Sequence, residues 1–163
     1  MRWLALALTL LANPALSLSC QRPDPVRDFQ TAEADDARWG IAVGRLDFDE
    51  GRVPKVDWNR QDAVPPQTDL RATMVGHALD PSGYNTVFQA NVTLRVLCFG
   101  PWCASPKSGA RYLAFIKHEN GKRVVQADPC GNWLHFNPRP EDLDRVHKCL
   151  VGGPCKERGF PMP

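Results

Sequence analysis

Residues 88–98 read Phe-Gln-Ala-Asn-Val-Thr-Leu-Arg-Val-Leu-Cys, and this stretch decides the fold class. Apolar side chains occupy every second position from Phe88 to Cys98, and the positions between them are mostly polar. A period of two is typical of a β-strand with one buried face. The stretch therefore predicts a strand in a sheet that covers a core on one side.

Further strand signals lie on both sides of this stretch. They occupy residues 39–48, 70–79, 112–116 and 124–127. Asn120-Gly121 joins the last two and is a strong signal for a β-hairpin. Glycines in 39–48 indicate a bend or a bulge in that strand. The polar segment 49–68 contains three prolines and is expected to form a loop.

Two short helices are expected at the ends of the domain. Asp24-Pro25 combines a helix cap with a first-turn proline, and the helix should run to about Ala34. Its apolar side should hold Val26 and Phe29, with Ala32 or Glu33. The second helix begins near 140, with acids in its first turn, bases in its last and Gly152-Gly153 beyond its end. Its expected apolar face consists of Leu143, Val146 and Leu150.

The first 19 residues read as a secretory signal peptide. Arg2 precedes an apolar run from Leu4 to Leu11, and Ser17-Leu18-Ser19 forms a small-residue exit. The run is too short to span a bilayer as a permanent helix. We therefore expect residues 1–19 to be removed and residues 20–163 to form one exported domain, periplasmic or extracellular, with no transmembrane segment after cleavage.

Cleavage after Ser19 would make Cys20 the first residue of the mature chain. That position carries the acyl chains in bacterial lipoproteins, but lipoprotein signals usually place a leucine three residues before the cysteine, where this chain has Ser17. An unmodified Cys20 is therefore the preferred interpretation, and a lipid-anchored envelope protein is an alternative.

An even number of cysteines in an exported chain predicts three disulfides, whose pairing the sequence alone does not fix. A long bridge from Cys20 to a distant partner such as Cys130 would contribute about 5 kcal/mol, and a short one about 2 kcal/mol. Cys98 with Cys103, and Cys149 with Cys155, could each close a short loop. The six candidates are Cys20, Cys98, Cys103, Cys130, Cys149 and Cys155.

No catalytic residue, metal site or cofactor is predicted. Gly100-Pro101 lies between Cys98 and Cys103, but redox-active cysteine pairs have two residues between them, whereas this pair has four. A structural disulfide is therefore preferred, and a thiol oxidoreductase using Cys98 and Cys103 is an alternative. Ligand-type spacing is absent among the histidines, as is a nucleophile elbow. We expect the large aromatic side chains to pack in the core or against loops, namely Trp39, Trp102, Trp133 and Phe136.

Charge excludes one class of partner. The chain carries 20 Lys and Arg residues against 18 Asp and Glu, and only Arg2 is lost with the signal peptide. This near balance is not that of a nucleic-acid binder. A protein partner is the remaining macromolecular expectation.

The order of these features resembles the netrin-like module, the OB-fold barrel shared by the tissue inhibitors of metalloproteinases and by several small exported bacterial proteins. The matching stretches are Cys20 followed by 25–34, the strand after Trp39, residues 91–100, and residues 109–115 with the Asn120-Gly121 hairpin and Cys130. The resemblance implies a small five-stranded OB-like barrel. Family members commonly open with two cysteines one residue apart, whereas this chain has only Cys20.

In the inhibitors of that family, the free amine and carbonyl of an N-terminal cysteine bind the zinc of the protease. The resemblance could assign this role only to Cys20. The sequence thus predicts a mainly β, disulfide-bonded, exported and non-enzymatic binding module of unknown ligand. The alternatives are a lipid-anchored envelope protein, a metalloprotease-inhibitor-like protein and a thiol oxidoreductase.

Overall fold

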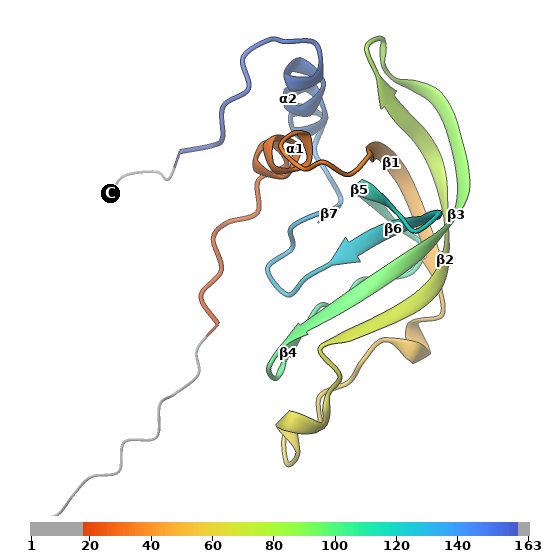
Figure 1. The fold of residues 1–163 in the computed structure, drawn as a ribbon, viewed down its shortest axis with the longest axis vertical. Helices are drawn as coiled ribbons and strands as arrows, with labels where there is room; N and C mark the ends of the chain where they lie inside the picture. Colours follow the sequence, from red (N-terminus) through yellow and green to blue (C-terminus); the bar gives the residue numbers. More distant parts are fainter. Residues whose placement is uncertain (1–17, 160–163) are drawn as a thin grey trace, which may run out of the picture.

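The computed structural model describes residues 18–159, so the predicted signal peptide lies outside the described residues except for Leu18 and Ser19. The fold is mainly β, with two α-helices and two short 3-10 turns, Glu50–Arg52 and Gln61–Ala63 (Figure 1). In chain order the helices and strands are α1 (Pro25–Glu33), β1 (Trp39–Phe48), β2 (Gln67–Asp80), β3 (Gly83–Phe99), β4 (Trp102–Cys103), β5 (Ala110–Glu119), β6 (Lys122–Ala127), β7 (Leu134–Phe136) and α2 (Pro140–Leu150).

Five of the strands pair in a closed ring. β1 pairs with β2 on one edge and with β5 on the other, β2 pairs with β3, and β6 pairs with both β3 and β5. Every one of these pairings is antiparallel except that of β3 with β6, which is parallel. The two remaining strands extend the sheet, because β4 pairs with β3 and β7 with β5.

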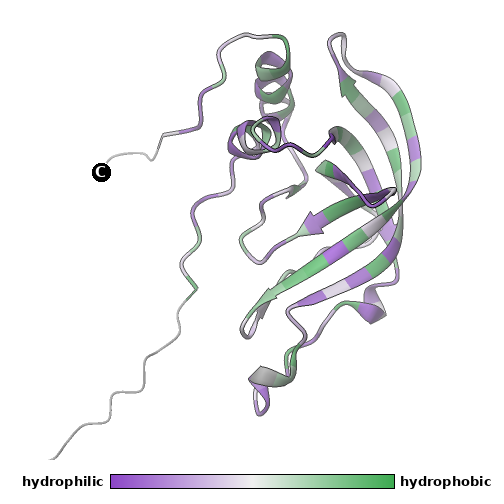
Figure 2. Ribbon diagram, in the orientation of Figure 1, coloured by the Kyte–Doolittle hydropathy of each residue, from purple (hydrophilic) through white to green (hydrophobic). Residues whose placement is uncertain are grey.

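The ring surrounds the larger of two hydrophobic clusters. The predicted alternation of 88–98 is confirmed from Val92 to Cys98, where the even-numbered side chains are buried. The bands of alternating hydropathy along β2 and β3 are visible in Figure 2. The largest side chains that the interior buries fully come from several strands: Leu46, Met74, Leu94, Val96, Ile116 and Val125.

The second cluster lies between the helices and the outer face of β1 and β5. Val43 and Phe115 point away from the ring interior and pack with Phe29 of α1 and Val146 of α2. The helices therefore cover one side of the ring. The outer face of β2 and β3 is left open, as Figure 2 shows.

Most of the predicted elements are found, with three differences. The predicted strand 88–98 is the second half of a longer strand, and β4 and β7 were not predicted because they are too short to show a period. The predicted apolar face of α2 is wrong at Leu150, which is 39% exposed. Cys149 is buried in its place, since its disulfide to Cys155 lies in the second cluster.

Two glycines allow β1 and β2 to approach closely. Gly44 pairs directly with Gly76, and a Cβ built on Gly76 would lie 2.1 Å from the carbonyl oxygen of Val43. A Cβ on Gly44 would lie 2.2 Å from the carbonyl oxygen of Val75. Both are backbone atoms that cannot turn away, so no larger residue fits without moving the strands.

Replacement of Gly76 by alanine should therefore destabilise the fold. Separating β1 from β2 strains the ring, and we expect the free energy of unfolding to fall by about 2 kcal/mol. Urea denaturation with the disulfides intact measures the change. Gly40→Ala in β1 is the matched control, because the nearest atom to its Cβ, Nε2 of His118, is 3.8 Å away. Equal effects of the two substitutions would contradict the close-approach argument.

Candidate functional site

All six cysteines expected to be oxidised form three disulfides, and none among the described residues is free. Cys20 bonds to Cys130 over a sequence separation of 110, whereas Cys98–Cys103 and Cys149–Cys155 close short loops. A long-range bond removes the most freedom from the unfolded chain. The N-terminal segment is thus tied to the loop after β6.

Cys98 and Cys103 face each other across the β3–β4 hairpin. Their Cα atoms are 3.9 Å apart, and Cys98 is 4% exposed. The backbone holds this hairpin as well, because Cys98 N donates to the carbonyl of Pro66 and Ala104 N donates to that of Leu97. The disulfide closes a tight turn whose geometry the neighbouring hydrogen bonds already favour.

The loop that receives Cys20 is ordered by one buried carboxylate. Asp128 accepts hydrogen bonds from the backbone N–H groups of Cys130 and Asn132 and from the side-chain amide of Asn132. Gly131 has a φ of +79°, and a Cβ there would come within 3.2 Å of Pro23. The segment from Cys20 to Pro23 therefore lies against a fixed loop, with Cys20 exposed at its end.

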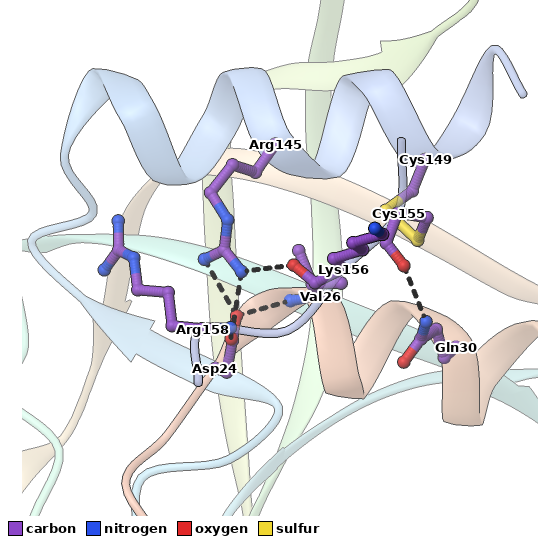
Figure 3. Close-up of a disulfide and its surroundings, with 8 residues drawn as sticks. All are labelled: Asp24, Val26, Gln30, Arg145, Cys149, Cys155, Lys156 and Arg158. Carbon is purple, nitrogen blue, oxygen red and sulfur yellow. Dashed lines mark hydrogen bonds and ion pairs between the residues drawn. A yellow bond between two sulfur atoms is a disulfide. The ribbon is translucent and has the colours of Figure 1, made fainter. Parts of the chain in front are cut away.

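Asp24 joins the two ends of the domain (Figure 3). Its carboxylate caps α1 by accepting from Val26 N at 3.0 Å, and it accepts two hydrogen bonds from the guanidinium of Arg145 in α2, each at 2.9 Å. The backbone N–H of Arg158, in the C-terminal segment, donates to the same carboxylate. Arg145 also donates to the carbonyl of Lys156. One nearly buried carboxylate thus holds α1, α2 and the C-terminal segment together.

The pKa of Asp24 depends on two opposing effects, burial of the carboxyl group and its hydrogen bonds. Burial by itself raises the pKa of a carboxyl group, because it disfavours the charged form. The bonds from Arg145, Arg158 N and Val26 N outweigh burial and lower the pKa of Asp24 from 3.8 to about 2. The folded state therefore favours the ionised carboxylate.

A second buried carboxylate ties α1 to β7. Asp28 accepts from the backbone N–H of Trp133 and from Nε2 of His135, both at 2.7 Å. Trp133 stacks on Trp39 with 4.8 Å between the ring centroids, which agrees with the predicted packing role of both tryptophans. Phe136 packs edge-on against the ring of Tyr112, with 5.7 Å between the centroids, but it remains 64% exposed and is not part of the core.

An open groove of about 830 Å³ crosses the outer face of β2 and β3. The turn between β5 and β6 forms one wall, and the end of β1 contributes to the lining. The outward side chains of Thr73 and Asn91 lie opposite each other on its floor, and the threonine hydroxyl donates to the asparagine amide oxygen at 3.3 Å. The groove is polar and accessible along its length.

The charges that line this groove are not balanced. Asp47 pairs with Arg45 at 2.9 Å, and Asp69 pairs with Arg95 at 3.1 Å. Three cationic residues also line it, and in the part of the chain that the structure describes none of them forms an ion pair: Arg71, Lys122 and Arg123. The groove therefore has positive charge available to a ligand.

Further basic side chains lie beside the β5–β6 turn. Arg38 donates to Nδ1 of His118 at 3.2 Å. Burial, together with the charges of Arg38 and Arg123, lowers the pKa of His118. The histidine is half-buried.

No residue of the groove was predicted to bind a ligand. Asn91 and Thr93 were expected only as polar positions of the strand 88–98, and Gly121 only as part of a hairpin turn. Within residues 18–159 the structure contains no group of three or more His, Cys, Asp or Glu side chains that could hold a metal ion. In the same residues no helix has the length and hydrophobicity to cross a membrane.

Comparison with protein-family models, with curated proteins and with solved structures finds no match to this chain. The assignment of a function therefore depends on the geometry of the molecule itself.

Replacement of Asp24 by alanine should loosen both ends of the domain. The change removes a helix cap and leaves Arg145, whose side chain is 20% exposed, without its partner. We expect the free energy of unfolding at neutral pH to fall by about 3 kcal/mol. Asp144→Asn, at an exposed pair with Lys148 on α2, is the control and should cost less than about 0.5 kcal/mol.

The same residue predicts a pH dependence. Because folding lowers the pKa of Asp24, its ionised form stabilises the native state above the usual pKa of 3.8, and this contribution is lost as the pH falls through about 2. Asp24→Asn can still cap the helix but cannot titrate. Unfolding curves recorded between these two pH values should show a smaller loss of stability in the variant than in the wild type, and parallel losses would disprove the assignment.

Proposed function

We propose that this chain is an exported, non-enzymatic binding module and that the groove over β2 and β3 is its ligand-binding surface. The observation that carries the proposal is that three cationic side chains gather along one open groove and form no ion pair within residues 18–159: Arg71, Lys122 and Arg123. These side chains are fixed at their bases by paired strands and a tight hairpin turn. The surface is therefore ordered before a ligand arrives, which lowers the entropic cost of binding.

The charges define the class of ligand. The groove carboxylates Asp47 and Asp69 already have arginine partners, so the charge left for a ligand is positive. The groove is open and its lining follows β2 from Asp69 to Thr73, and an open surface along a strand fits an extended chain better than a compact molecule that needs enclosure. We therefore propose that the ligand is an extended acidic segment of a protein partner, bound mainly by charge and with a strong dependence on salt.

The ring of strands supports an OB-like barrel of the netrin-like type. Its pairing order is β1-β2-β3-β6-β5 and back to β1, with the single parallel contact between β3 and β6. A five-stranded Greek-key barrel of this type binds ligands on the face of its second and third strands. The groove of this chain lies on that face, and the β5–β6 turn stands beside it.

Export is supported by the chemistry of the cysteines. Three disulfides persist in oxidising compartments and are rare in reducing ones. Together with the predicted signal peptide, they favour the periplasm or the extracellular space.

Removal of the groove cations should weaken binding of an acidic ligand. The triple substitution of Arg71, Lys122 and Arg123 by alanine should lower the affinity for a synthetic oligoglutamate peptide at least about tenfold at low salt, which corresponds to about 1.4 kcal/mol. Titration calorimetry or fluorescence anisotropy with a labelled peptide measures the effect. The affinity of the wild-type protein for the peptide should also fall as salt is added.

The control is a triple variant with the same change of charge outside the groove, at Arg22, Lys107 and Lys156. At a salt concentration of about 0.15 M, where long-range attraction is screened, it should bind the peptide within about twofold of the wild type, because none of its three substituted residues lines the groove. If both triple variants lose affinity equally, the attraction comes from net charge and the groove is not the site.

A second candidate function is inhibition of a zinc protease, as in the netrin-like inhibitors. One observation favours it: the disulfide to Cys130 anchors Cys20 at an exposed position against the loop of Asp128. After cleavage before Cys20, its amine and carbonyl would project from a fixed base. Those are the groups that bind the protease zinc in the family.

This second candidate predicts that an added N-terminal residue abolishes inhibition. Mature protein beginning at Cys20 should slow a zinc protease at nanomolar concentration, and a variant with one alanine before Cys20 should not, because its amine is displaced from the metal. Peptide-substrate kinetics measure both proteins. Inhibition that survives the added residue, or no inhibition by either protein, removes this candidate.

The two remaining alternatives, a lipid anchor and a thiol oxidoreductase, depend on whether the cysteine sulfurs are acylated, reduced or disulfide-bonded. A lipid anchor needs the sulfur of Cys20 that the structure bonds to Cys130, so the two states exclude each other, and the intact mass of the mature chain distinguishes them. A thiol oxidoreductase requires Cys98–Cys103 to open under mild reductant, which thiol titration reports.

A further inference from the structure

The first half of β3 has a neighbour on only one edge. Its pairing with β2 runs from Gly83 to Leu97, but its pairing with β6 covers only Thr93 to Val96. From Asn85 to Asn91, therefore, one edge of β3 has no strand beside it in the part of the chain that the structure describes. Figure 1 shows this part of β3 along the outer side of the β2–β3 hairpin.

The direction of the backbone groups follows from two hydrogen bonds at the far end of the strand. Cys98 N donates toward β2, to the carbonyl of Pro66, and the carbonyl of Leu97 accepts from Ala104 on the opposite side. In an antiparallel ladder, alternate residues direct both backbone groups to the same neighbour. The backbone N–H and C=O groups of the even-numbered residues of β3 thus point toward β2. The backbone N–H and C=O groups of the odd-numbered residues Asn85, Val87, Gln89 and Asn91 point to the free edge.

This edge lacks the features that usually prevent strand addition. Natural sheets protect an open edge with charged side chains, proline or a bulge. Here residues 82–94 contain neither a charged residue nor a proline. Val87, in the middle of the edge, is 77% exposed. A free, uncharged and regular edge of this length is a template for another strand.

We propose that a second copy of this chain pairs with this edge, so that β3 of each copy forms an antiparallel ladder with β3 of the other about a two-fold axis. Two-fold pairing requires a surface that is complementary to itself. In the register centred on Phe88, Val87 pairs with Gln89 of the second copy and Asn85 with Asn91. Every open backbone group of those residues then has a partner.

The side chains fit this register. Asn85 donates from Nδ2 to the carbonyl of Ser82, and Asn91 accepts at Oδ1 from Thr73. The Oδ1 of Asn85 and the Nδ2 of Asn91 are left to form a hydrogen bond across the two strands. The exposed Val87 is placed beside Gln89 of the second copy and loses much of its contact with water. The absence of charge on residues 82–94 means that two identical edges meet without repulsion, whereas a charged peptide would gain no ion pair there.

The proposal does not rest on the ligand assigned to the groove, because it depends on backbone groups of the β3 edge; the two surfaces meet at Asn91, which also lines the groove beside the β5–β6 turn. Sedimentation velocity or light scattering of the mature, oxidised protein should show a reversible dimer with a dissociation constant in about the micromolar range. Amide exchange adds a test of the register, because the N–H groups of Val87 and Gln89 should become protected as the concentration of protein rises.

Two variants test the edge itself. Val87→Glu places like charges near the two-fold axis and should raise the dissociation constant at least about tenfold. Gln89→Pro removes an N–H that faces the free edge and leaves the ladder with β2 intact, so it should also weaken the dimer. Val75→Glu, on the outer face of β2 and opposite Arg45, is the matched control and should dimerise as the wild type does.

Circular dichroism and the absence of free thiols show whether each variant is folded. A protein that stays monomeric up to about 100 μM overturns the proposal, as does a dimer that folded Val87→Glu and Gln89→Pro leave unchanged. Loss of the dimer in Val75→Glu as well would also overturn it, because the contact would then involve the sheet face and not its edge.

Discussion

Strand β1 forms hydrogen bonds on both of its edges, and the rest of the structure depends on this double pairing. Its partner on one side, β2, is the next strand in the chain, but its partner on the other, β5, begins more than sixty residues after β1 ends. Closing the ring requires β1 and β2 to bend together, which the direct contact of Gly44 with Gly76 allows. Once the ring is closed, each strand has an inner face toward one core. Its outer face is either covered by a helix or open to solvent.

The two helices decide which strands of the ring have a covered outer face. α1 and α2 pack over β1 and β5, and the Asp24 carboxylate with the Cys20–Cys130 disulfide keeps both ends of the domain on that side. Residues 18–159 contain no third α-helix to cover β2 and β3. The outer face of these strands is polar for that reason, and the groove with its cationic residues lies there. The groove and the free edge of β3 are thus two results of one arrangement.

The local elements could be read from the sequence because each has a local cause. The alternation of 88–98 reports burial of one strand face, Asp24-Pro25 supplies a cap and a fixed φ, and Asn120-Gly121 supplies the positive φ values of 49° and 73° that the tight hairpin needs. The parallel contact of β3 with β6 has no such signal, because it depends on the closure of the whole ring. The error at Leu150 has a different origin: Cys149 was considered only as a disulfide candidate, and it occupies the buried position on α2 that was assigned to Leu150.

The groove residues could not be found from the sequence for a different reason. Several Lys and Arg residues in the described part of the chain form no ion pair, and Arg71, Lys122 and Arg123 are distinctive because they gather around one groove. That gathering, like the pairing of Arg95 with Asp69, depends on which strands are neighbours. The nearly equal numbers of acidic and basic residues do not reveal the cationic groove, because many acidic residues form ion pairs with cations outside it. Pairing of two β3 edges would make the β2 and β3 faces of both copies one continuous sheet, with a groove on each half. An extended acidic ligand that reaches both grooves would then bind with a higher effective concentration at the second site than at the first.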